Sequence, residues 1–383
     1  MEFIKETSPH LHRKDSLTRM LLDVIIALAP VIIMSYISYG LLAFRSFAVS
    51  IATMILAEFV FVLIRNKIPY DGTKHSLKEH FLAGVKKYRV TNLLASIVSG
   101  AIFALICPVQ TDPEWLIYIV LISGSLFGMI IGKLVFGGTG SNIFNPAAVG
   151  MVFAKLCFGS RYVYPTTWFM DTGSSVTTGG TPLTAIANNS AVGVNNYIGV
   201  FSNLTEYSIL DLFLGRVPGV LGEAFKFAIL LGMIYLLIRH AADFRVILSY
   251  LGAYIGLMAI VGLIVCLKLP DTNFFVFLAF EVLSGGVLFG AVYMLTDPVT
   301  MPINSPGRVI YGLIAASLTV LIRIFGAFPE GVVFSILIVN MLSPLIDYPK
   351  WGDQRYSRNK IIVMVSIVAI TVLALVLGLV FAQ

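Results

Sequence analysis

A polar segment at residues 170–196 contains the side chains whose types and spacing best suit chemistry. It is rich in Gly, Ser, Thr and Asn, and its centre reads Thr178-Gly179-Gly180-Thr181. The two glycines give the backbone maximal freedom, so another protein could bind this segment and reach a neighbouring hydroxyl. We therefore interpret Thr181, and after it Thr178, as a candidate attachment point for a group. The simpler interpretation is an exposed loop threonine that caps a turn.

Two further polar stretches interrupt apolar sequence. They carry amide, hydroxyl or carboxylate side chains: Ser141, Asn142 and Asn145 before Pro146 in the first, and Thr296, Asp297 and Asn304 in the second. Asn and Ser at such a break often cap the orphan N–H groups of a helix, which is the simpler interpretation. The alternative is a pocket in which the amides pair with the carbonyl and N–H groups of a ring.

The composition indicates a polytopic membrane protein. The 383 residues are 58% hydrophobic and 12% charged, with a mean hydropathy of +0.91. Soluble domains carry about twice that charged fraction. The net charge of +6 comes from basic residues in short loops, where membrane orientation places them, so it does not indicate nucleic-acid binding.

The apolar runs predict an all-α fold of about 10–11 transmembrane helices in the cytoplasmic (inner) membrane. The basic loops are predicted to be cytoplasmic and the polar segment extracytoplasmic. The predicted parts are an N-terminal cytoplasmic arm (1–19), a first membrane repeat (20–158), the extracytoplasmic loop (159–216), a second membrane repeat (217–347), and a basic loop with an extra C-terminal helix (348–383).

A short echo predicts the internal repeat. The sequence SGSLFG from Ser123 is echoed by SGGVLFG from Ser284, and an Asn-Pro or Ser-Pro pair follows each copy. From the number of spans between the copies we expect them to be inverted relative to one another. Inverted repeats with helices broken at matched places put binding sites near the bilayer midplane.

Ionisable side chains within the spans are costly, so they usually have a function. Glu281 and Glu58 are the candidates for a sodium or proton pathway. The simpler interpretation is a buried carboxylate capped by hydroxyls or by an interfacial lysine. Lys133 and Arg323 lie close enough to span ends that we expect them to snorkel to the interface.

Metal chemistry is not expected from this chain. Its three cysteines form no C-x-x-C pair, and its five histidines lie outside the predicted spans. An iron–sulfur cluster and a haem are both poorly supported for this reason, although one cluster could be shared with another subunit. We expect no metal ligands and no catalytic side chains, so an organic cofactor must carry any electrons.

Several motifs, in family order along the chain, resemble the RnfD and NqrB membrane subunits of ion-pumping electron-transport complexes. They are SPHLH, GGTGSNIFNPAAVG, YMLTDPVTMP with SPGRVIYG, and EGVVFSILIVNMLSPLID. In that family a Ser/Thr-Gly-Ala-Thr motif carries FMN through a phosphoester to its last threonine. The resemblance therefore implies covalent FMN on Thr181. This chain departs from the motif at Gly180, where the family has Ala, and at Ser175, where an Asp is often found.

The resemblance has further implications for function. It implies a second, non-covalent flavin or riboflavin near Asn142 and Asn145, and electron relay between ferredoxin- and NAD-linked subunits coupled to Na⁺ or H⁺ movement. The implied partners are the other Rnf subunits, including a second covalent-flavin subunit, together with a flavin transferase and membrane lipid. Two alternatives stay open: a solute transporter or channel, which inverted repeats suit equally well, and an NqrB-type, quinone-linked subunit.

Overall fold

The computed structural model describes residues 16–65, 85–86, 88–164, 183, 208–268, 273–326, 331–348 and 354–381. Within these ranges the chain is almost entirely helical, and the short strands β1 and β2 pair antiparallel. The elements are α1 (Leu17–Tyr39), α2 (Leu41–Arg65), α4 (Val90–Ile106), β1 (Gln110–Thr111), α5 (Leu116–Met129), the π-helical turn η1 (Ile130–Leu134), α6 (Pro146–Phe158), the 3₁₀ turn η2 (Gly159–Arg161), β2 (Tyr162–Val163), α9 (Ile209–Leu214), α10 (Leu221–Ala224), α11 (Lys226–Ile238), α12 (Phe244–Lys268), α13 (Phe274–Leu283), α14 (Val287–Phe289), the π-helical turn η4 (Gly290–Met294), α15 (Ser305–Phe325), α16 (Val332–Ile346) and α17 (Arg358–Phe381).

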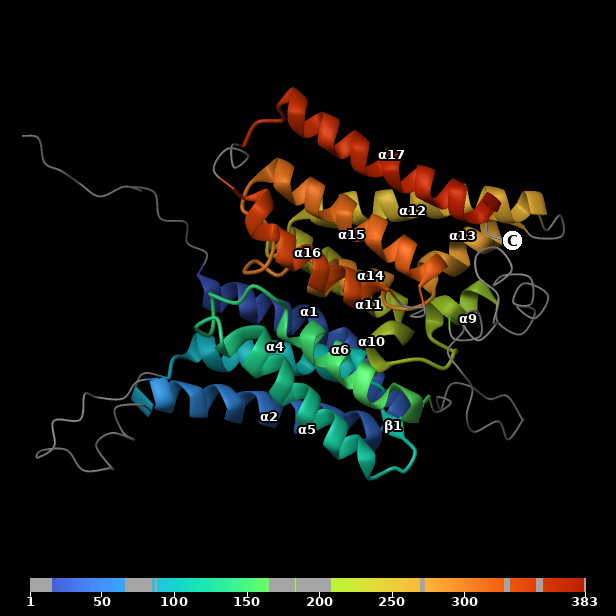
Figure 1. The fold of residues 1–383 in the computed structure, drawn as a ribbon. Helices are drawn as coiled ribbons and strands as arrows, with labels where there is room; N and C mark the ends of the chain where they lie inside the picture. Colours follow the sequence, from blue (N-terminus) through green and yellow to red (C-terminus); the bar gives the residue numbers. More distant parts are fainter. Residues whose placement is uncertain are drawn as a thin grey trace, which may run out of the picture.

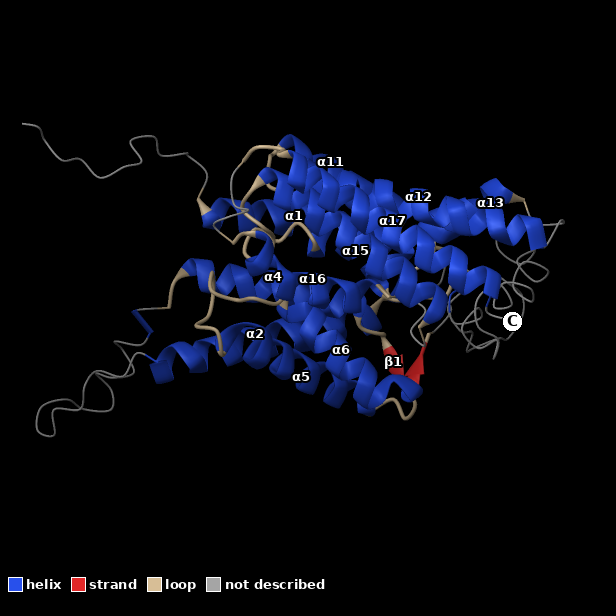
Figure 2. Ribbon diagram, turned by 45° about the horizontal axis from the view of Figure 1, so that its top comes forward, coloured by secondary structure: helices blue, strands red, loops and turns tan. Residues whose placement is uncertain are grey.

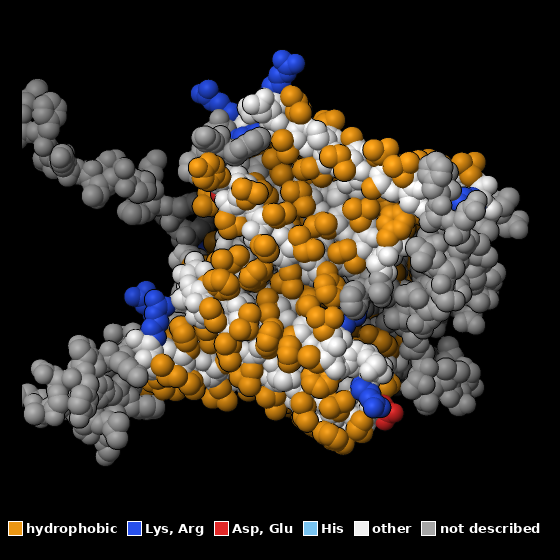
Figure 3. Space-filling view, in the orientation of Figure 1, with side chains coloured by type: hydrophobic (Ala, Val, Ile, Leu, Met, Phe, Trp, Pro, Cys, Tyr) orange, Lys and Arg blue, Asp and Glu red, His pale blue; other side chains and the backbone are white. Residues whose placement is uncertain are grey.

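The long helices lie roughly side by side in one bundle (Figures 1 and 2). Among the described residues, six helices are long and apolar enough to cross a membrane, and the bent pair of α13 with α14–η4 makes a seventh candidate span. The apolar helices α4, α11 and α16 are shorter, with 13 to 17 residues. Hydrophobic side chains cover the flank of the bundle between its ends (Figure 3). The chain is an all-α polytopic membrane protein, as its composition predicts.

Small residues let neighbouring helices approach closely. A Cβ atom added to Gly150 in α6 would lie 2.6 Å from the carbonyl oxygen of Gly124 in α5. Such small-residue contacts are a common basis of helix packing in membranes, where the lipid removes the hydrophobic driving force. Polar contacts also join distant helices. Asp23 of α1 accepts a hydrogen bond from Tyr235 of α11 at 2.9 Å.

Some helix contacts are similar in the two halves of the chain. In the first half α2 packs on α4 and α5, and α5 packs on α6; in the second half α12 packs on α13 and α15, and α15 packs on α16. The end of α2, at Arg65, hydrogen-bonds to Gly137, whereas the beginning of α12, at Arg245, hydrogen-bonds to Ser305. Because α2 ends and α12 begins at the same end of the bundle, these two helices run in opposite directions (Figure 1).

The two copies of the short sequence echo lie in α5 and at the junction of α13 with α14. Both α5 and α13 start at the end of the bundle that holds β1 and α9, and each leads through a π-helical turn into a break (Figure 1). The breaks at residues 135–145 and 295–304 contribute to one cleft at the opposite end. The expectation that these two copies are inverted is wrong. Three spans separate them, and an odd number of intervening spans restores the original direction.

Candidate functional site

Residues from both breaks line one cleft. Its walls include Asn142, Asn145, Thr296 and Asp297, and its cavity volume is about 70 Å³. Pockets that hold small molecules usually measure roughly 300–1,000 Å³, so this cleft is narrow. The structure thus brings together four of the predicted binding residues, although 151 positions separate Asn145 from Thr296 in sequence. The remaining lining is mostly apolar and comes from α1, α4, α11 and η4.

The first break is shaped by glycines and closed by an asparagine cap. Gly137, Gly138 and Gly140 have positive φ values of 117°, 95° and 92°, which side chains with a Cβ rarely adopt. Asn145 then caps α6, since its Oδ1 accepts hydrogen bonds from Ala147 N at 3.0 Å and Ala148 N at 3.5 Å. Asn145 Oδ1 therefore caps the helix, as the simpler interpretation predicts.

The other polar atoms of the two amides suit a ring ligand. Asn142 Nδ2 donates to the carbonyl oxygen of Phe144 at 3.1 Å, and both asparagines are more than nine-tenths buried. Within the described part of the chain, Asn145 Nδ2 and Asn142 Oδ1 have no hydrogen-bond partner. One donor and one acceptor thus remain in the cleft wall. This pair is complementary to the ring carbonyl and N–H groups of a flavin, so the polar atoms match that cofactor, and the narrow cleft has to widen to admit the ring.

The second break is held mainly by its own side chains. Asp297 accepts hydrogen bonds from Val299 N at 3.3 Å and from Thr300 Oγ1 at 3.2 Å. The hydroxyl of Thr296 donates to the carbonyl oxygen of Val292 at 2.5 Å. Thr296 and Asp297 line the cleft, but these contacts are those of a structured turn.

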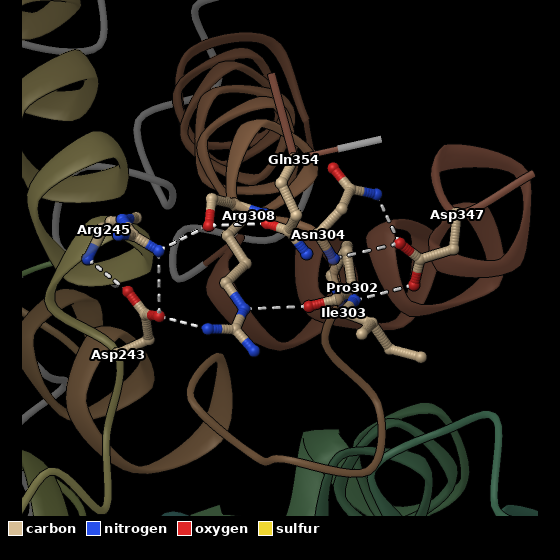
Figure 4. A network of polar contacts seen from close by, with 9 residues as sticks. Asp243, Arg245, Pro302, Ile303, Asn304, Arg308, Asp347 and Gln354 are labelled. Atoms are coloured by element: carbon tan, nitrogen blue, oxygen red, sulfur yellow. Dashed lines mark hydrogen bonds and ion pairs between the residues drawn. The ribbon is translucent and has the colours of Figure 1, made fainter. Parts of the chain in front are cut away.

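A polar network fastens the far side of this break (Figure 4). Asn304 caps α15 and donates to Asp347 Oδ1 at 2.5 Å, and Arg308 forms an ion pair with Asp243. Asn304 does not line the cleft, so the structure does not bring it together with its sequence counterpart Asn145. The network explains why the chain turns sharply before α15.

Lys133 is a buried member of the cleft wall. Its ammonium lies 2.9 Å from Glu58 Oε2, and the exposed fractions of the two side chains are 3% and 1%. Glu58 also accepts hydrogen bonds from Ser96 and, at 2.7 Å, from Thr139 Oγ1. The expectation that Lys133 snorkels to the interface is wrong, because the π-helical turn η1 directs it inward toward α2. Hydroxyls and a lysine satisfy Glu58, as the simpler interpretation predicts.

A second buried ion pair lies away from the cleft. Arg323 of α15 contacts Glu281 Oε2 of α13 at 2.9 Å, with exposed fractions of 2% and 0%. Arg323 also donates to the hydroxyl of Tyr254 at 2.5 Å and to the carbonyl oxygen of Glu281 at 2.8 Å. Arg323 therefore does not snorkel either. It satisfies the backbone where α13 ends before the break at Gly285.

The remaining predicted site residues either do not line the cleft or lie outside the described residues. Ser141 is exposed and does not line the cleft. Thr178, Gly179, Gly180 and Thr181 lie outside the described residues. The nearest described position is Leu183, which is buried and packs against Gly285 beside Lys226 and Glu223.

Sequence reasoning missed Lys133 as a site residue. The signal in the sequence was the position of Lys133 one helical turn before the Gly-Gly pair at residues 137–138, where the first break begins. A lysine next to a break at membrane depth has a route into the pocket that a lysine at a regular helix end lacks.

Fold and site together define a multi-pass membrane protein with a polar cleft formed by broken helices. A family model described as "NQR2, RnfD, RnfE family" matches residues 4–351. The chain belongs to this family.

Three relatives illustrate the similarity. The chain is 35% identical over 254 residues to one subunit of the Na(+)-translocating NADH-quinone reductase of Chromohalobacter salexigens, and the alignment covers 66% of this chain and 57% of that protein. It is 31% identical to the subunit of the same name from Ectopseudomonas mendocina, covering 90% of this chain and 87% of that protein. It is 28% identical to one subunit of the proton-translocating ferredoxin:NAD(+) oxidoreductase complex of Clostridium ljungdahlii, covering 90% and 93%. The chain is thus an Rnf/Nqr-type membrane subunit.

Proposed function

We propose that this chain is the flavin-carrying membrane subunit of an Rnf-type complex. In this role it relays electrons between ferredoxin- and NAD-linked subunits, coupled to Na⁺ or H⁺ translocation. The observation that carries the proposal is the cleft in which buried amides of the first break face the second break beside Lys133. The relative from Clostridium ljungdahlii, aligned over nine-tenths of both chains, supports the Rnf-type assignment.

The cleft residues have distinct roles in this proposal. When bound, a flavin supplies one- and two-electron transfer. Asn145 Nδ2 would donate to a ring carbonyl, and Asn142 Oδ1 would accept from a ring N–H. Lys133, paired with Glu58, would hold its ammonium in the wall, where it would favour negative charge on a reduced ring. The apolar lining excludes water around these groups.

A second flavin completes the proposal. We assign covalent FMN to the Thr181 hydroxyl. Its loop belongs on the outer side of the membrane in this proposal, because the basic residues of the other loops favour a cytoplasmic position. The segment that a flavin transferase recognises includes Thr178, Gly179 and Gly180. The partners are the remaining subunits of the complex, including one with its own covalent flavin.

A quinone-linked role in an Nqr-type complex is the second candidate. It is favoured by the relatives named as subunits of the Na(+)-translocating NADH-quinone reductase, which include the 35% identical protein. Electron acceptors separate the two candidates. Membranes that reduce NAD with reduced ferredoxin through this chain support the Rnf-type role, and membranes that reduce quinone with NADH support the other.

The flavin content of the purified complex tests the proposal directly. We expect a yellow preparation, a fluorescent band for this chain on a denaturing gel, and additional flavin that extraction releases. The gel band measures covalent flavin, and the extracted flavin measures how much non-covalent flavin the cleft holds. A colourless, non-fluorescent chain would point instead to a solute transporter or channel.

Leucine at Asn142 and Asn145 removes the polar atoms that the cleft offers. We expect each replacement to lower extractable flavin severalfold and to leave the gel fluorescence unchanged, because buried polar recognition discriminates strongly. Asn145→Ser is the matched control, since serine keeps the cap of α6 and loses only the amide donor. Unchanged extractable flavin in a folded double Leu variant would return both residues to helix capping alone.

A further inference from the structure

The C-terminal helix has no counterpart in the matched family region. The match ends at residue 351, whereas α17 begins at Arg358 and continues to Phe381. In the structure α17 packs along α15 and α12 (Figure 1). A Cβ atom on Gly378 would clash with the ring of Phe325, so the far end of α17 fits tightly. Lys268 of α12 also donates to the carbonyl oxygen of Leu379 at 2.9 Å.

The near end of α17 leaves a groove. It lies between α15, α16 and α17, is lined mainly by apolar side chains, and has a volume of about 380 Å³. This volume is within the range of pockets that bind small molecules, roughly 300–1,000 Å³. Ile310 and Ile314 of α15 face Val363 and Ile367 of α17 across it. Without α17 this groove would be an open flank of the bundle.

Basic and aromatic residues surround the mouth of the groove. The described residues 354–360 contain three basic residues and no acid. Lys360 lines the groove and is 3% exposed, and Arg355 and Arg358 are exposed next to it. Tyr348 and Tyr356 are each about half exposed at the same end, which is typical of the membrane–water interface.

A hydrogen-bonded anchor fixes this basic segment against α15. Gln354 Oε1 accepts hydrogen bonds from Ser305 N at 3.0 Å and Ser305 Oγ at 2.9 Å (Figure 4). Lys360 Nζ donates to the carbonyl oxygen of Arg355 at 3.2 Å. The basic residues are therefore held at the mouth of the groove, and their position does not depend on a ligand.

We propose that α17 and the segment before it form a binding site for one anionic phospholipid. An acyl chain lies in the groove between α15 and α17, and the phosphate lies among Arg355, Arg358 and Lys360. Basic pockets between membrane helices bind anionic headgroups in this way. A neutral lipid satisfies the apolar lining but offers the basic rim no net negative charge, so the charge of the mouth selects the anionic lipid.

Native mass spectrometry of the full-length chain in mild detergent tests the site. We expect phosphatidylglycerol to bind about a hundredfold more tightly than phosphatidylcholine of the same chain length, given about 1 kcal/mol for each of the three basic residues near the headgroup. Arg358→Gln combined with Lys360→Gln leaves Arg355 alone and should reduce this preference to about fivefold. Arg216→Gln is the matched control, because Arg216 is a half-exposed basic residue that does not line the groove.

A steric pair of variants on the same helix locates the lipid. Val363 lines the groove, whereas Val365 is 62% exposed on another face of α17. Val363→Trp should abolish the tightly bound phosphatidylglycerol, and Val365→Trp should retain it. Equal binding of both lipids, or retention of the anionic lipid in Val363→Trp, would overturn the proposal. A dimer that dissociates in Val363→Trp would also overturn it and assign the groove to a second copy of the chain.

Discussion

Thr181→Val is expected to remove the covalent flavin from this chain completely. Valine keeps the branched shape of threonine but has no oxygen, so it cannot form the phosphoester. We expect this substitution, within a polar segment of the sequence, to change the free energy of unfolding by no more than about 0.5 kcal/mol. Electron transfer through the complex should fall steeply, because the missing carrier leaves a gap in the chain of cofactors. Denaturing-gel fluorescence and mass spectrometry of the loop peptide measure the loss.

Neighbouring threonines supply the controls for this experiment. Thr178→Val should retain part of the adduct, since that side chain serves recognition by the transferase and not the bond. Thr184→Val should retain all of it. The assignment fails if the adduct persists in Thr181→Val, or if the peptide from the parent carries it on Thr184.

Lys133→Met should destabilise the protein more than almost any other single substitution outside the apolar core. Methionine fills the space but leaves Glu58 buried without its ammonium, and breaking such a pair costs about 3–5 kcal/mol. The cleft also loses its positive charge. We therefore expect a lower unfolding temperature in detergent, together with a lower midpoint potential for the extractable flavin, because the reduced ring is stabilised less.

Two further variants separate the ion pair from simple charge removal. Glu58→Gln with Lys133→Met leaves no unpaired charge, so it should recover much of the stability and part of the potential. Arg216→Gln removes a charge from an exposed pair at 3.7 Å and should cost no more than about 1 kcal/mol. If Lys133→Met is as stable as Arg216→Gln, the buried pair contributes nothing measurable.

The class of fold could be predicted because it depends on averages over long segments. Runs of apolar residues fix the helices within a few positions: the first predicted span starts at Met20, and α1 starts at Leu17. Caps are equally local, and the Asn-Pro pair at residues 145–146 begins α6 as expected. The membrane class and the two breaks follow from such local information.

Which side chains of a helix point into the bundle could not be predicted in the same way. Lys133 and Arg323 are near span ends in sequence, and nothing local distinguishes a snorkelling lysine from one that turns inward. The π-helical turn η1 rotates Lys133 toward α2, and this rotation depends on tertiary contacts. The meeting of Asn145 with Asp297 likewise depends on how the two halves of the bundle dock. The attachment motif lies outside the described residues, so covalent flavin on Thr181 stays a prediction.

The buried ion pairs also have a consequence for biosynthesis. Glu58 and Lys133 are 75 positions apart in the chain. A ribosome adds about 5–20 residues per second, so the lysine is made roughly 4 to 15 s after its partner. During this interval α2 carries an uncompensated carboxylate, whose transfer to the centre of a bilayer costs about 2.5–3.5 kcal/mol. The nascent α2 should therefore stay beside the translocon until α5 emerges, and the order of synthesis helps to set the order of membrane assembly.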